Sequence, residues 1–296
     1  MKAAGAWTWW NEYGSVPLDA CVQRVVDAGI GVIVKAGYWH EFEGFKKAGV
    51  PVAVERYVYP NKPAVEVSYL AEGMDRGASF IVINAEVEWE SLAAHEMEDL
   101  LRQLRRRVGR DVELYASIDS RGDRTGRPHQ RALAREITAW MPMVYPLEFR
   151  PHRPAGFVRR GFTDCLDAGQ SFAGKPVLPT IQAYHKIGPN AVIEQVQEAV
   201  RRGLPGVQAY TICHATNQEW AAFVKAVDGQ WEDDMPQLWL VKERGSSATF
   251  ITNGVVRAYV ADRAKLQELQ DVGIWPDKVT VVPKESLSAI PRVDTL

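Results

Sequence analysis

Residues 17–37 read PLDACVQRVVDAGIGVIVKAG, a stretch that predicts one helix followed by one strand. Pro17 suits the first position of a helix, where its missing amide N–H needs no partner, and Gly29 suits the residue that follows the last turn. From Gly31 to Gly37 the chain forms a short apolar run rich in β-branched residues, which is typical of a buried strand. The stretch therefore predicts the helix–strand unit of an α/β protein.

The same alternation continues on both sides of this stretch. We predict strands at residues 6–10, 31–37, 51–59, 80–88, 112–117, 139–145, 177–184 and 206–211. Helices are predicted at residues 17–29, 41–48, 63–76, 93–108, 129–136, 156–168, 189–202 and 217–227. Eight strand–helix units in about 230 residues match the size of a (β/α)8 TIM barrel. A doubly wound open sheet is the alternative, but it usually has fewer strands, and no GxGxxG motif follows the first strand.

A change of composition marks the end of the predicted barrel. Residues 228–236 (DGQWEDDMP) are acidic and end in proline, as a linker would. We therefore divide the chain into a barrel at residues 1–230, a linker at 231–236 and a small α+β module at 237–296. The module is predicted to contain strands and one helix, with turns at Gly245-Ser246-Ser247 and Asn253-Gly254: strands within 237–243, 249–260 and 279–282, and a helix at 263–271.

Composition excludes several classes of protein. Hydrophobic residues make up 46% and charged residues 24% of the 296, which is ordinary for a globular protein and not for a disordered, collagenous or coiled-coil chain. Three distant cysteines favour buried free thiols over a disulfide framework. The six histidines contain no HExxH motif, so we predict no metal and no cofactor.

Partners and location are predicted from charge and hydropathy. A formal net charge of −2 makes nucleic acid an improbable partner, and no apolar run approaches the roughly 20 residues that cross a bilayer, so no membrane partner is expected. The first residues lack the apolar stretch of a signal peptide, so we expect the chain to be made in the cytoplasm. Residues 102–160 hold 14 arginines and six acidic residues, a local net charge of +8. This region is either a solvated helix face or an assembly contact for a protein or anionic partner.

The strand predicted at residues 80–88 carries the main candidates for catalysis. Side chains alternate along a strand, so Val82, Asn84, Glu86 and Glu88 share one face, while the opposite face is apolar. The apolar face suits the helix layer, and the polar face then points into the barrel. Active sites of such barrels lie at the C-terminal ends of the strands. Two acids on one face raise the pKa of one of them, as a general acid requires. The alternative is that Glu86 and Glu88 pair with Lys35 or Arg56.

Other strand ends supply aromatic and polar side chains to the same end of the barrel. Aromatic rings stack on the apolar faces of sugars while amides and carboxylates bind the hydroxyls. The residues predicted to bind substrate in this way are Asn84, Trp7, Trp9, Lys35, Tyr57, Tyr59, Tyr115, Tyr145, Gln182, Tyr184 and Tyr210.

Glycoside hydrolysis needs two carboxyl groups flanking the bond. Glu86 is the predicted proton donor, and Glu55 or Glu88 the second carboxylate. A separation of about 5–5.5 Å would give retention of configuration and about 6.5–9.5 Å inversion. A barrel enzyme of another chemistry, such as a lyase with Lys35 as a Schiff-base residue, is a further alternative.

Short motifs make the predicted barrel resemble glycoside hydrolases. Lysozyme-type muramidases of phage endolysins carry Asp-x-Glu at the end of strand four, where this chain has Asn84-Ala85-Glu86. Chitinase-like enzymes carry Asp-x-Asp-x-Glu, where this chain continues with Val87-Glu88. They also carry Met-x-Tyr on strand six, which matches Met143-Val144-Tyr145. The resemblance covers residues 5–227. The C-terminal residues 251–260 are similar to small tails appended to proteins of actinobacterial phages.

The resemblance implies a glycosidase that acts on cell-wall or related amino-sugar polysaccharide, for example as a phage lysin that reaches the wall at lysis. Asn84 replaces the first aspartate of both motifs, and an amide cannot act as a base or a nucleophile. The alternative is therefore a non-catalytic carbohydrate-binding or structural barrel, such as a tail or receptor-binding component of a virion.

Overall fold

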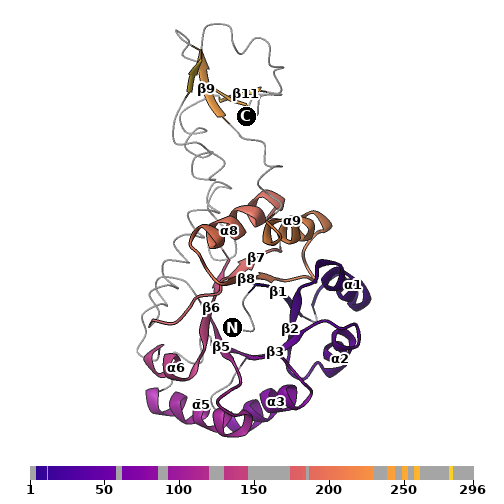
Figure 1. The fold of residues 1–296 in the computed structure, drawn as a ribbon, viewed down its shortest axis with the longest axis vertical. Helices are drawn as coiled ribbons and strands as arrows, with labels where there is room; N and C mark the ends of the chain where they lie inside the picture. The colour runs from indigo at the N-terminus through magenta and orange to yellow at the C-terminus, as the bar shows by residue number, and fades with distance from the viewer. Residues whose placement is uncertain are drawn as a thin grey trace. The chain divides into compact units, whose positions relative to one another are not determined.

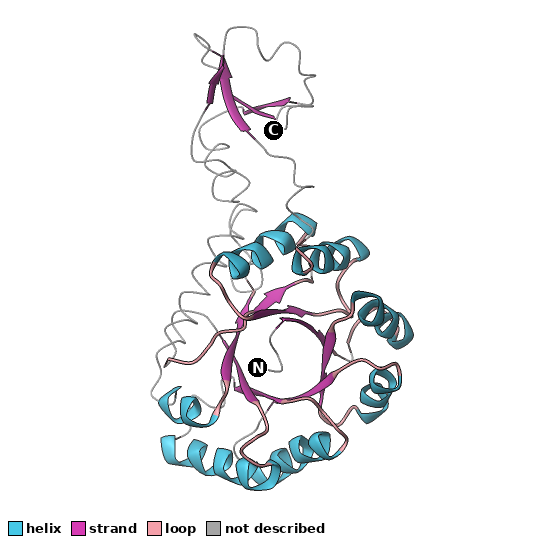
Figure 2. Ribbon diagram, in the orientation of Figure 1, coloured by secondary structure: helices cyan, strands magenta, loops and turns pink. Residues whose placement is uncertain are grey.

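The barrel predicted from the sequence is confirmed by the computed structural model of the chain. It describes residues 5–11, 13–57, 62–85, 93–119, 130–145, 174–184, 187–229, 239–243, 249–252, 257–260 and 280–282. Eight strands pair in parallel and in chain order, and the last pairs with the first, which closes the barrel. Figure 1 shows the helices arranged outside this ring of strands, and Figure 2 shows the same layers by type of structure.

Strands and helices begin and end close to their predicted residues. The strands are β1 Gly5–Trp10, β2 Gly31–Lys35, β3 Val52–Tyr57, β4 Ile81–Ala85, β5 Leu114–Asp119, β6 Ala139–Val144, β7 Thr180–Gln182 and β8 Gly206–Tyr210. The described helices are α1 Leu18–Ala28, α2 Trp39–Lys47, α3 Pro63–Asp75, α5 Ala94–Val108, α6 Gln130–Glu136, α8 Pro189–Arg201 and α9 Asn217–Val227. The helix predicted at 156–168 lies outside the described residues.

Two differences from the predicted boundaries have local causes. Strand β7 is shorter than predicted because Pro179 has no N–H to donate to the ladder. Val177, two residues before Pro179, forms only an isolated bridge, with Trp140. Helix α1 begins at Leu18, one residue later than predicted, while Gly29 takes the expected left-handed conformation with φ 64°.

Large apolar side chains fill the half of the barrel interior that lies toward the N-terminal ends of the strands. The Trp7 ring packs edge-on against Phe80 at 4.6 Å between centroids, and Phe80 packs in the same way against Tyr115 at 4.9 Å. Gly31 makes room for the indole, since a Cβ there would lie 2.4 Å from the Trp7 ring. These contacts make the N-terminal half of the barrel a packed core and not a channel.

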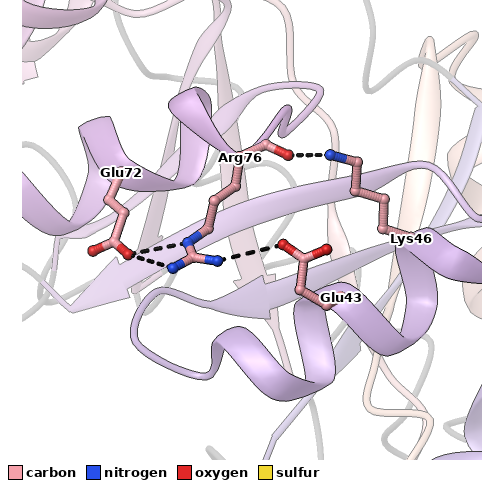
Figure 3. Close-up of polar contacts among 4 residues, drawn as sticks. All are labelled: Glu43, Lys46, Glu72 and Arg76. Atoms are coloured by element: carbon pink, nitrogen blue, oxygen red, sulfur yellow. Dashed lines mark hydrogen bonds and ion pairs between the residues drawn. The ribbon is translucent and has the colours of Figure 1, made fainter.

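Ion pairs tie neighbouring helices together at the N-terminal end of the barrel. The Arg76 guanidinium donates to Glu72 at 3.0 and 2.8 Å and to Glu43 at 3.4 Å, and Lys46 donates to the Arg76 carbonyl (Figure 3). This group joins the C-terminal ends of α2 and α3. Because its side chains are about one-third exposed, solvent screens each pair, and its contribution to stability is small.

Several arginines of the basic region are engaged within the barrel. Arg105 donates to the carbonyl of Val112 at 2.6 Å and lies 3.7 Å from the Glu136 carboxylate. Arg107 pairs with Asp75, and Arg135 pairs with Glu98, both at 2.7 Å. These contacts favour the interpretation of a helix face over that of an assembly contact. Residues 121–129 and 146–160 lie outside the described part.

The chain divides into two compact units. The first holds Met1–Tyr145 and Thr163–Asp228, and the second holds Pro146–Phe162 and Gly229–Leu296. The described strands of the second unit form one sheet in the order β11-β10-β9-β12: β9 Trp239–Glu243, β10 Thr249–Thr252, β11 Arg257–Val260 and β12 Thr280–Val282. The run predicted at 249–260 is thus two antiparallel strands on either side of the predicted Asn253-Gly254 turn. The linker predicted at 231–236 and the helix at 263–271 lie outside the described residues.

Two features are absent from the described part of the chain. None of the helices in the described ranges is long and apolar enough to cross a membrane. Within the same ranges there is no group of three or more His, Cys, Asp or Glu side chains that could hold a metal ion.

Candidate functional site

Strand alternation places the predicted polar residues on the inner face of the barrel. Val82 lies in the barrel core, so Asn84, two residues further along β4, faces the same interior. Asn84 is the register partner of Tyr57 on β3 and of Ser117 on β5. Glu86 and Glu88 follow in the chain and lie outside the described residues, as does Tyr59. Their roles therefore stay predictions.

Glu55 is a buried carboxyl group near the C-terminal end of β3. Its residue is 6% exposed, and its register partner on β2 is Lys35. The Lys35 ammonium lies over the Tyr38 ring at 5.6 Å from the centroid. The strands thus bring an acid and a base together on the inner face, at the end of the barrel where such folds place their active sites.

Arg56 lies on the opposite face of β3 from Glu55, where its side chain makes several contacts. It donates to Glu66 at 2.6 Å and to the Ala36 carbonyl at 3.1 Å, and its guanidinium stacks over Tyr69 at 4.2 Å. Glu66 and Tyr69 belong to α3, outside the barrel. The strand thus turns the Arg56 side chain toward the helices, which disfavours the alternative that it pairs with Glu86 or Glu88; both of these residues lie outside the described part of the chain.

Three tyrosines from adjacent strands meet at the C-terminal end of the barrel, and we call Tyr145, Tyr184 and Tyr210 the tyrosine cluster. Their ring centroids lie 5.5–5.6 Å apart in all three pairs. Trp9 on β1 extends the group, at 6.0 Å from Tyr210. Gln182 on β7 is the register partner of Tyr210 and lies beside the tyrosine cluster. Four predicted substrate-binding aromatic residues are thus brought together.

Buried polar atoms without partners accompany these aromatic rings. The Trp9 indole N–H and the Asn84 amide oxygen are both inaccessible to solvent and have no hydrogen-bond partner among the described residues. A buried polar group without a partner costs about 1–3 kcal/mol. Together they offer one donor and one acceptor to a ligand that carries hydroxyl or amide groups.

Trp7 and Tyr115 were predicted to bind substrate, and the structure places them in the core instead. Trp7 packs against Phe80 in the N-terminal half of the barrel interior, and Tyr115, which also contacts Phe80, is 0% exposed. The Tyr115 hydroxyl donates to Glu113 at 2.7 Å, next to the N-terminal start of β5. The alternation of side chains along a strand predicts correctly which residues face the barrel interior. It does not predict how far along the barrel axis each of them lies.

Two residues of the site were missed because they follow the end of the first strand. The Asn11 amide donates to the Tyr210 hydroxyl at 3.1 Å and accepts from the Tyr13 N–H at 3.1 Å. Tyr13 is 78% exposed, and among the described residues no other aromatic side chain is as open to solvent. An Asn two residues before an aromatic, just after a strand, is the pattern that would have indicated this turn.

The N-terminal end of the barrel holds a cavity of about 530 Å³. Its lining is mostly glycine, alanine and valine, and Asp228 is its one charged residue. It offers no pair of acid and base groups, so the candidate site is the C-terminal end.

Comparison with known proteins finds similarity in structure and not in sequence. No family model and no curated protein matches the chain. The chitinase from Chromobacterium violaceum is similar with a TM-score of 0.55 and 14% identity, over 77% of this chain and 100% of that one. The class V chitinase from Nicotiana tobaccum gives a TM-score of 0.55 and 12% identity, over 78% and 100%.

A third similar structure is the spore cortex-lytic enzyme of Bacillus megaterium. It has a TM-score of 0.51 and 9% identity, over 74% of this chain and 73% of the enzyme chain. At these identities the likeness shows the barrel fold alone. The similarity of residues 251–260 to small tails appended to proteins of actinobacterial phages stays a prediction.

Proposed function

We propose that this chain is a glycoside hydrolase that acts on a cell-wall or related amino-sugar polysaccharide. The observation that carries the proposal is the tyrosine cluster with Trp9, which lies at the same end of the barrel as Glu55 and Asn84. Rings, buried amides and carboxylates in one place are the elements of a sugar site. The similar barrels of two chitinases and a cortex-lytic enzyme support the substrate class.

In the proposed reaction Glu86 donates its proton to the glycosidic oxygen as the bond to the anomeric carbon breaks. As that bond breaks, Glu55 or Glu88 acts in one of two ways. It attacks the anomeric carbon and forms a glycosyl-enzyme, which water then hydrolyses with Glu86 as the base, or it takes a proton from the water molecule that attacks this carbon directly. The oxygen of Asn84 accepts a hydrogen bond from the substrate, and the Trp9 N–H donates one. The tyrosine cluster forms the apolar floor under the sugar ring.

A second candidate function is a carbohydrate-binding barrel without catalysis, as in a virion component that attaches to the wall. The amide of Asn84 favours it, because this group cannot take the part of the aspartate in the resembling motifs. Both candidates predict binding to walls, and only the first predicts release of sugar.

The test is turbidity loss and reducing-sugar release from purified bacterial walls and from chitin oligomers. We expect release by the wild type and its loss, by about 10²–10⁴-fold, in Glu86→Gln. Parallel Glu88→Gln and Glu55→Gln variants identify the second carboxylate. Circular dichroism checks that each variant is folded. Wall binding without release by the wild type would instead establish the second candidate.

A further inference from the structure

Two cysteines that are distant in sequence meet where the barrel closes. Cys21 lies on α1, and Cys213 lies three residues beyond the end of β8; both are free and fully buried. The two thiols lie close enough to shift each other's pKa. The pairing of β8 with β1 brings these segments together, so their proximity depends on the closed barrel.

The two sulfurs have different surroundings. The backbone N–H of Asn11 donates to the Cys213 sulfur at 3.3 Å. The neighbouring Cys21 thiol, joined by the hydrogen bond from Asn11, lowers the pKa of Cys213 although burial opposes the effect. The same pairing with Cys213, together with burial, raises the pKa of Cys21. One sulfur is therefore suited to be a thiolate, and the other keeps its proton.

The backbone around the pair is held in place from several sides. The N–H of Val16 donates to the Cys213 carbonyl at 3.2 Å, and the Cys21 thiol contacts the Val16 carbonyl at 3.7 Å. Arg24, one turn after Cys21, donates to the carbonyls of Ile212 and Ala215 at 2.9 and 3.2 Å. A Cβ on Gly14 would lie 1.9 Å from that of Cys213, so the loop packs directly on this residue. The segments that carry the two cysteines are thus held side by side, with Val16 between them.

We propose that Cys21 and Cys213 are a redox-active dithiol, with hydrogen peroxide or a related peroxide as the oxidant. The Cys213 thiolate attacks one peroxide oxygen, the O–O bond breaks, and Cys213 becomes a sulfenic acid while hydroxide leaves and is protonated to water. The Cys21 sulfur then attacks the Cys213 sulfur, the S–O bond breaks, and a second water leaves with the Cys21 proton. The pair gives two electrons to the peroxide and forms one disulfide.

The disulfide would join α1 to the segment after β8 across the seam of the barrel. In the segment after β8, the Cys213 sulfur accepts a hydrogen bond from the backbone N–H of Asn11. The side chain of Asn11 donates to the hydroxyl of Tyr210 in the tyrosine cluster. Oxidation therefore locks the seam next to the candidate site. The proposal does not depend on glycosidase activity.

The test uses the full chain with Cys165→Ser, which removes the third thiol. The protein is treated with hydrogen peroxide, quenched with catalase, alkylated under denaturing conditions and weighed. We expect a loss of about 2 Da, two fewer alkylated thiols and a cross-linked peptide that contains Cys21 and Cys213, all reversed by dithiothreitol. We also expect the oxidised form to melt roughly 5–10 °C higher. Both free thiols after treatment, or oxygen added to Cys213 beside a free Cys21, would overturn the proposal.

A second variant separates the two steps. In Cys21→Ser with Cys165→Ser the resolving thiol is gone, so peroxide should stop at a sulfenic acid on Cys213 that dimedone traps. The matched variant Cys213→Ser with Cys165→Ser should give no dimedone adduct. Labelling of Cys21 in that variant would show that the roles are not those assigned here.

Discussion

Asn84 places a buried amide oxygen, with no donor among the described residues, two positions before the predicted proton donor. Because the described residues supply no donor to this oxygen, removing it breaks no hydrogen bond among them, and a ligand can supply the donor instead. This separates its effect on binding from its effect on stability.

We expect Asn84→Ala to leave the melting temperature nearly unchanged and to lower sugar release or wall binding about threefold to tenfold, the worth of one hydrogen bond. Thermal melts and release assays measure the two effects. The matched control is Thr8→Ala, which removes a buried hydroxyl that donates to the Ala209 carbonyl at 3.0 Å. The control should lose about 1–3 kcal/mol of stability and keep its affinity. A reversed pattern would make Asn84 a structural residue.

Tyr13 presents an aromatic ring to solvent from a turn held by Asn11. An exposed ring on a turn that Asn11 links to Tyr210 of the tyrosine cluster is suited to stack on a further sugar unit of a long chain. We expect Tyr13→Ala to weaken binding to intact walls about threefold to tenfold and to spare stability, while Tyr13→Phe retains binding. Val65→Ala, at a residue 48% exposed on α3, serves as the control in the same pull-down. Equal binding by Tyr13→Ala and the control would exclude this role.

On the scale of single elements, α8 contains a carboxylate that two arginines hold. Glu198 is 4% exposed and accepts hydrogen bonds from Arg202 at 2.6 Å and from Arg201 at 2.8 Å. Burial acts to raise the pKa of this carboxyl, but the bonds and charges of both arginines outweigh it and hold the pKa below its ordinary value. Because the folded pKa is the lower one, the stabilisation is present above the unfolded pKa of about 4.3 and is lost as pH falls through the folded value.

Glu198→Gln should therefore lower the free energy of unfolding by about 1–3 kcal/mol at pH 7 and by much less at the acid end of the same series. Denaturant titrations from pH 7 down to about pH 3 check this expectation. Glu72→Gln on α3 is the matched control, since Glu72 also binds an arginine but is 40% exposed (Figure 3). Its effect should stay within about 1 kcal/mol. A pH-independent loss in Glu198→Gln would contradict the electrostatic account.

On the scale of the whole molecule, the barrel closes on itself without any strand of the C-terminal sheet. A chain that ends after Gly229 should therefore fold, unfold in one cooperative transition and keep activity on soluble oligomers. Calorimetry and sugar-release assays on this truncated chain measure the outcome. Failure to fold would mean that the C-terminal residues complete the barrel.

The sequence predicts the barrel well because each strand and most helix ends carry local signals, such as Pro63 and Pro189 at the first turns and Gly29 after α1. Alternation also places Glu55 and Asn84 on the inner face, and it turns Arg56 outward. Three features needed the closed structure. The layer of Trp7 and Tyr115 depends on strand register, the turn at Tyr13 lies beyond a strand end, and the proximity of Cys21 to Cys213 depends on the seam.

That seam also has a consequence for synthesis. Strand β1 is made first, yet one of its two neighbours is β8, which ends at Tyr210. At about 5–20 residues per second, β1 waits roughly 10–40 s on the ribosome with one edge open. An open edge of a β-strand invites pairing with other chains. Nascent chains that stall before β8 are therefore the form of this protein that we expect to depend most on chaperones.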